Sequence, residues 1–220
     1  MRQQNSQPFK AAFVMLGAMF SFTLMAIAGR ELAGNLDTFE IMMYRSFIGV
    51  LIVLSIAATA GKLNDINANK LGLHTLRNTV HFIGQSLWLY ALIHIPLSQL
   101  FAFEFTHPLW VAILAPFMLG EIMTRKRIFA FVIGFVGILI VARPESAPIT
   151  IATFAAVACA FMFALTTICT KYLGKTETTL SIMFWLTVIQ AGFGLICAGY
   201  DGDIAIPPVN VFHWVAIVGL

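Results

Sequence analysis

Long apolar segments alternate with short polar connections along this 220-residue chain. The clearest runs cover Ala11–Gly29, Ile41–Gly61, Ile149–Thr170 and Thr178–Tyr200, and Arg45 is the single charged residue within them. At about 1.5 Å per residue, roughly 20 apolar residues cross a hydrocarbon core of about 30 Å, and a helix satisfies its own backbone groups there. The pattern therefore predicts an all-α, polytopic helical membrane protein.

Three further spans follow from the same pattern, at residues 73 or 79 to 93, 97–120 and 128–142. The third and fourth spans are separated at His94-Ile95-Pro96, which predicts a tight hairpin. The fifth ends before Arg143 and Pro144, because the residue before a proline disfavours helix. A last apolar segment, Val211–Leu220, is too short to cross a bilayer. We therefore expect seven full spans and the start of an eighth.

Basic residues fall mainly on one side of this arrangement. With the amino terminus in the cytoplasm, ten of the 13 lie inside, Arg30 and Arg143 lie outside, and Arg45 lies in the membrane. This asymmetry satisfies the positive-inside rule and predicts an integral protein of the bacterial inner membrane. The composition agrees, with 60% hydrophobic and 10% charged residues. The net charge of +3 is scattered among loops, so no nucleic acid partner is expected.

A shift of 140 residues places the first and second spans on the sixth and seventh. The matched positions are Gly34 with Gly174, Asp37 with Glu177, Thr38 with Thr178 and Met43 with Met183. Because five spans separate the copies, they point in opposite directions, which is the inverted repeat of secondary transporters. Residues 1–145 would form the first five-helix unit and residues 146–220 an incomplete second one. Doubling predicts about 280 residues for five plus five helices, so we expect a truncated form here.

Several motifs resemble one transporter family. They are Phe103-Glu104-Phe105-Thr106-His107-Pro108-Leu109-Trp110, Leu119-Gly120-Glu121, Gly134-Phe135-Val136-Gly137, Arg143-Pro144 and Glu40-Ile41-Met42-Met43-Tyr44-Arg45. Together they resemble the drug/metabolite transporter superfamily, in particular its EamA branch, which includes members for S-adenosylmethionine uptake. The resemblance implies ten helices in two inverted halves and transport of a small metabolite without a cofactor. It leaves the substrate, the direction, proton coupling or exchange, and a homo-oligomer open.

Charged and polar residues at membrane depth are the candidate site, because each needs a partner or water there. Arg45 and Glu104 lie at similar depths on the second and fourth spans. Helical spacing places His81, Gln85 and Trp88 on one face of the third span and Glu104 and His107 on one face of the fourth. We expect these six residues to converge on one substrate-binding cavity, with Arg45 contacting an anionic group and Glu104 a proton or a cationic group. Thr166, Thr167, Thr170 and Gln190 are additional candidates for its wall.

Three alternatives remain open. Arg45 and Glu104 could form a buried ion pair that joins helices, with the histidines bonded to backbone carbonyls. His81, Glu104 and His107 could in principle hold a metal or act as acid and base, but no HExxH, phosphate-binding or nucleophile-elbow motif supports a membrane enzyme. A non-transporting membrane component is the third. Cys159, Cys169 and Cys197 lie in apolar runs, so packing is expected rather than a disulfide framework.

Overall fold

The computed structural model describes residues 8–33, 35–120, 124–142, 150–200 and residue 204. All regular elements within these residues are helical, which confirms the predicted class. The elements are α1 (Pro8–Leu32), α2 (Thr38–Thr59), the 3-10 helix η1 (Leu63–Asp65), α3 (Leu71–His94), α4 (Leu97–Glu104), α5 (His107–Leu119), α6 (Arg125–Ala142), α7 (Ile151–Leu173) and α8 (Thr179–Tyr200). The predicted Val211–Leu220 segment, Arg143 with Pro144, and the 145/146 boundary lie outside the described residues.

Each of the seven predicted spans is helical, and five are long and apolar enough to cross a membrane. These five are Phe13–Leu32, Thr38–Thr59, Leu97–Leu119, Ile151–Leu173 and Thr179–Tyr200. The third span carries His74 and Arg77, and α6 begins with a basic triplet, which lowers the apolar character of both. The exact number of crossings stays a prediction.

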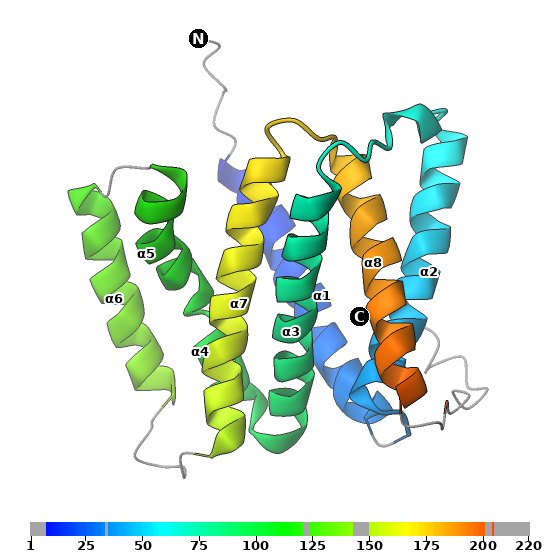
Figure 1. The fold of residues 1–220 in the computed structure, drawn as a ribbon. Coiled ribbons are helices and arrows are strands. Elements are labelled where there is room, and N and C mark those ends of the chain that lie inside the picture. The colour runs from blue at the N-terminus through cyan, green and yellow to red at the C-terminus, as the bar shows by residue number, and fades with distance from the viewer. Residues whose placement is uncertain (1–7, 34, 121–123, 143–149, 201–203, 205–220) are drawn as a thin grey trace.

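The helices of the repeat run in opposite directions. In Figure 1, α1 begins at the end of the bundle marked by the amino terminus and runs away from it, whereas α7 runs toward that end. The second pair is opposed in the same way, since α2 runs toward that end and α8 away from it. The predicted inversion of the first two spans relative to the sixth and seventh is thus observed.

Local signals explain where α2 and α3 begin and end. Asp37 Oδ1 accepts from the backbone N–H groups of Phe39 and Glu40, and Glu40 Oε2 accepts from the N–H of Asp37, forming a capping box at α2. Helix α3 starts at Leu71, close to the earlier of the two expected starts. It ends at His94, and the next residue, Ile95, is extended because Pro96 follows.

The predicted fourth span is two helices rather than one. The Thr106 hydroxyl donates to the Phe103 carbonyl at 2.5 Å, and Pro108 has no N–H to offer the Glu104 carbonyl. The break therefore falls between Glu104 and His107, the two candidate site residues of this span. Pro116 lies within α5 without ending it.

Helix α3 stands at the centre of the bundle, where it packs against α7 and α8 (Figure 1). The repeat partners α2 and α8 also pack together, and Gly194 permits their closest approach. A Cβ at Gly194 would lie 2.8 Å from Met43 Cα, and one at Gly49 would lie 2.8 Å from Thr187 Cγ2. This contact fixes how closely α2 and α8 pack.

Burial is reversed relative to a water-soluble protein. The outer surface exposes large apolar side chains such as Phe20 and Ile196, whereas His74, Asn78 and Gln190 are buried. Polar groups that avoid the outer surface and apolar groups that cover it are what a lipid environment selects. The chain is an integral membrane protein. Its three cysteines are free thiols, as the sequence predicted.

Candidate functional site

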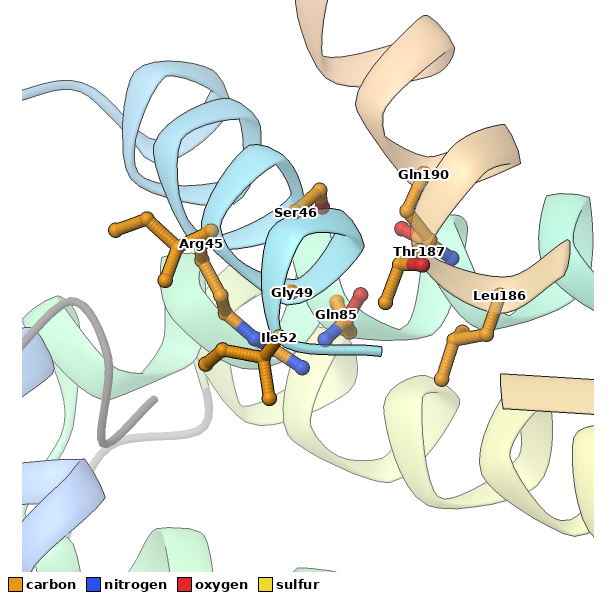
Figure 2. A pocket seen from close by; sticks show the side chains of 9 residues that line it. Arg45, Ser46, Gly49, Ile52, Gln85, Leu186, Thr187 and Gln190 are labelled. Carbon is orange, nitrogen blue, oxygen red and sulfur yellow. The ribbon is translucent and has the colours of Figure 1, made fainter. Parts of the chain in front are cut away.

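A cavity of about 140 Å³ lies between α2 and α8, with α3 behind it (Figure 2). It is lined by Arg45, Ser46, Ile48, Gly49 and Ile52 from α2, Gln85 from α3, and Leu186, Thr187 and Gln190 from α8. The wall is thus shared by the two inverted helices and the central helix. A cavity of this volume, with the polar groups of Arg45, Gln85 and Gln190 in its wall, is large enough for a few waters or a small polar group.

Arg45 is the charged residue of this wall, and its side chain extends toward Gln85 (Figure 2). The Gln85 amide is taken with its oxygen toward Arg45, because this orientation matches donors with acceptors. The oxygen then accepts from the two terminal guanidinium nitrogens at 2.5 and 2.9 Å, and the amide nitrogen donates to Gln190 Oε1 at 3.1 Å. The cation is therefore held by a neutral group beside open space.

Glu104 has different surroundings. Its Oε2 accepts a hydrogen bond from Trp88 Nε1 at 2.8 Å, which joins α4 to α3. The Trp88 ring is buried and meets Phe22 edge-on at 6.0 Å, and Phe22 also meets Phe101. The ion pair with Arg45, left open by the sequence, is not formed, since each charged group bonds to a neutral partner instead.

The two histidines of the predicted site, His81 on α3 and His107 at the start of α5, both contact α7. His107 Nε2 is 2.9 Å from Thr167 Oγ1, within hydrogen-bond distance. The His81 ring packs against Phe163 at 5.6 Å, and its Nδ1 has no partner among the described residues. The alternative in which the histidines bond backbone carbonyls holds in part, since His107 also bonds the backbone of Phe163, whereas no such bond is shown for His81.

The structure thus joins the six candidate residues in three groups. Arg45 and Gln85 face the cavity, Trp88 and Glu104 bond to each other, and His81 and His107 contact α7. Gln190 lines the cavity, as one of the additional candidates. Thr166 and Thr170 instead donate to carbonyls one turn earlier in α7.

Ser46, Gly49 and Thr187 were missed, because nothing in an apolar run marks which small residue faces a neighbouring helix. Their position depends on how α2 crosses α8. In the described part of the chain, no cluster of three or more His, Cys, Asp or Glu residues could hold a metal ion.

Comparison with known proteins points to one family. Residues 9–143, more than half of the chain, match the EamA-like transporter family. The S-adenosylmethionine uptake transporter of Rickettsia prowazekii is 27% identical over 86% of this chain and 60% of its own length. Riboflavin transporters of Brucella anthropi and Vibrio cholerae are 28% and 25% identical, over 81% and 96% of this chain and 64% and 71% of their own lengths.

The chain therefore spans less than two thirds of the length of the first two relatives. A crystal structure of a protein with 17% identity superposes with a TM-score of 0.62, covering 92% of this chain and 73% of the other. That likeness concerns the fold alone. The family and all three relatives are named as transporters rather than enzymes.

Proposed function

The chain belongs to the EamA-like transporter family, and from this premise we propose that it is a secondary transporter of a small zwitterionic metabolite, amino-acid-like or S-adenosylmethionine-like, that works by alternating access. The observation that carries the proposal is Arg45. Its guanidinium lies at a cavity between two inverted helices and is bonded to a neutral amide. A charge at membrane depth is expensive without a counterion, so an anionic group of the substrate is the partner that the position favours.

A second charge, of opposite sign, is held by the same helix. Gln85, which holds Arg45, and Trp88, which holds Glu104, are three residues apart on α3. The two holding residues are thus about 4.5 Å apart along the helix axis. A carboxylate would bind to Arg45, and an ammonium or sulfonium group of the same zwitterion would bind to Glu104.

The cavity volume supports a site that widens during transport rather than one of fixed size. Pockets that enclose a whole metabolite typically measure about 300 to 1,000 Å³, whereas this cavity measures about 140 Å³. It accommodates the charged head group, and the remainder of a nucleoside-sized substrate would need α2 and α8 to separate. Such separation of inverted units is the motion that alternating access requires.

The names of the relatives offer two substrate chemistries. S-adenosylmethionine carries a carboxylate, an ammonium and a sulfonium group, whereas riboflavin is uncharged. The charged groups of S-adenosylmethionine would supply counterions for Arg45 and Glu104. Riboflavin would leave both side chains without a counterion. The two charges therefore favour the zwitterion.

The proposed orientation places the amino terminus in the cytoplasm of a bacterium. The α2–α3, α5–α6 and α7–α8 connections lie at the same end of the bundle as the start of α1 (Figure 1). The connections at this end carry Lys62, Lys70, Arg125 and Lys175. The positive-inside rule supports the cytoplasm for this end.

Competition for uptake tests the proposal. The protein is reconstituted in vesicles, and uptake of radiolabelled S-adenosylmethionine is measured against unlabelled amino acids, riboflavin and simple carboxylates. We expect zwitterions to compete and riboflavin not to compete. Uptake that riboflavin blocks and zwitterions leave unchanged would contradict the substrate class. Vesicles that take up no labelled S-adenosylmethionine would instead favour a non-transporting membrane component.

A further inference from the structure

Two ionisable side chains are buried near the end of the bundle at which the basic loops lie, away from the cavity. His74 on α3 is fully buried, and neither of its ring nitrogens has a hydrogen-bond partner among the described residues. Glu177, in the connection between α7 and α8, is 7% exposed, and its Oε1 is also without a partner there. Leaving a buried polar group without a hydrogen bond is unfavourable. These two side chains have three such atoms among the described residues.

The charges around His74 are few. Arg77 lies one turn further along α3, and Glu177 lies in the α7–α8 connection. Arg77 is itself buried and donates to Thr170 Oγ1 at 2.9 Å and to Asn78 Oδ1 at 2.9 Å. From α8, the aromatic ring of Trp185 lies 6.2 Å from the imidazole. With His74 neutral, the negative and positive charges balance, and one added proton changes the charge of this buried group.

Ser181 connects Glu177 to the neighbouring loop. Its hydroxyl lies 2.8 Å from the Asn67 carbonyl and 3.5 Å from Glu177 Oε2, and it has one hydrogen to donate. Asn67 also accepts from Trp185 Nε1 at 2.7 Å, so the α2–α3 connection is fastened to α8. A protonated Glu177 would become a donor and change what Ser181 bonds.

The same bonds continue to the candidate site. The Trp185 carbonyl accepts from Asn78 Nδ2 at 3.1 Å, and the Asn78 carbonyl accepts from Gln190 Nε2 at 3.1 Å. Gln190 Oε1 in turn accepts from Gln85, which holds Arg45. One series of hydrogen bonds therefore runs from the buried Glu177 to the cation at the cavity.

We propose that His74 and Glu177 form a proton-binding pair that couples movement of the metabolite to movement of a proton. The proton adds to a lone pair of the His74 imidazole or to Glu177 Oε1, and no other bond forms or breaks. Binding of the proton changes the hydrogen bonds of Ser181. This in turn alters how the α2–α3 connection is bonded to α8, the helix that forms one wall of the cavity. The coupling rests on the proposed transport function, whereas proton binding by the pair does not.

Trp185 provides a test of proton binding that needs no substrate. An imidazolium beside an indole quenches its emission, so tryptophan fluorescence of the purified protein should fall on acidification, with a midpoint between about pH 5 and 8, where histidine changes charge. His74→Gln and Trp185→Phe should each remove this response, and Glu177→Gln should shift it to lower pH. His94→Gln, an exposed histidine beside Tyr90, is the matched control and should retain it. A wild-type response that persists in His74→Gln would overturn the pair.

Coupling is tested in vesicles with S-adenosylmethionine as the probe. An imposed proton gradient should drive accumulation by the wild type and not by His74→Gln or Glu177→Gln, while exchange of internal for external probe continues in both variants. Gradient-driven accumulation that is equal in all three proteins would overturn the coupling. If the wild type neither accumulates nor exchanges the probe, transport of S-adenosylmethionine by this chain and its coupling to protons are both contradicted, and the fluorescence response still decides proton binding.

Discussion

The two charged side chains beside α3 have contrasting surroundings. Arg45 reaches the Gln85 amide at the edge of a cavity, whereas Glu104 is held by the Trp88 indole, which itself packs against Phe22. One charge is ready to meet a ligand, and the other is covered by aromatic rings. On the proposed function, we expect the anionic end of a substrate to bind first and Glu104 to become available as the bundle rearranges. Arg45 should then govern affinity and Glu104 the rate of transport.

The largest effect is expected from Glu104→Gln. The variant keeps an acceptor for Trp88 Nε1 but loses the negative charge, so a cationic group would have no counterion in the membrane. We expect uptake to fall to the background of empty vesicles. The measurement is initial uptake at several substrate concentrations, with thermal unfolding as a check that the variant folds. Unchanged uptake would assign the carboxylate a structural role at most.

Arg45 should affect the Michaelis constant more than the maximal rate. Loss of one partner of a buried, hydrogen-bonded charge pair costs about 2 to 5 kcal/mol, so Arg45→Gln should raise KM by about 30-fold or more. Arg45→Lys keeps the charge but loses the two-pronged geometry, and we expect a rise of about tenfold. Equal KM values for the two variants would indicate that charge plays no part at this position.

Gly194→Ala tests the close contact between α2 and α8, the two helices that line the cavity beside Arg45. The new methyl group would lie 2.8 Å from Met43 Cα, so backbone must shift, and we expect destabilisation by about 1 to 3 kcal/mol. Gly192→Ala is the matched control on the same helix, because its Cβ would meet no atom within 4 Å. Thermal unfolding in detergent compares them. Equal unfolding temperatures would contradict the contact.

Trp88→Phe is expected to have the smallest effect. It removes the N–H donor to Glu104 while keeping an aromatic ring beside Phe22. A single hydrogen bond to a charged group contributes about 1.5 to 3 kcal/mol, and part of this is recovered if water replaces the indole. We expect a few-fold change in uptake rate with KM unchanged. A change in KM alone would contradict this expectation and would indicate that Trp88 contributes to substrate affinity rather than to the rate of transport.

The helices could be predicted from the sequence because the bilayer sets their length. Apolar runs such as Thr178–Tyr200 match α8 closely, and the inversion of α1 relative to α7 followed from the number of intervening spans. The break at Phe105 was not predicted. Pro108 indicated a kink, but whether a helix bends or ends depends on what its neighbours offer the freed carbonyl.

The site could be predicted only in part. Membrane depth singled out Arg45 and Glu104, since charge in an apolar run is visible in the sequence. Their partners were not visible, because Gln85 and Trp88 lie on one face of α3 and either could meet either charge. The burial of His74 and Arg77 was also missed. Arg77 was counted with the cytoplasmic loops, yet it lies within α3 and bonds to α7, a contact that depends on how the helices assemble.

The most direct test of the Arg45–carboxylate contact uses one pair of ligands and two proteins. Uptake inhibition is measured for the most effective zwitterion of the panel and for its decarboxylated counterpart, with the wild type and with Arg45→Gln. We expect the wild type to prefer the carboxylate form by about 100-fold and the variant to lose this preference, as removal of a charge pair predicts. The same preference in both proteins would show that Arg45 does not bind the carboxylate, and the proposed site would be wrong.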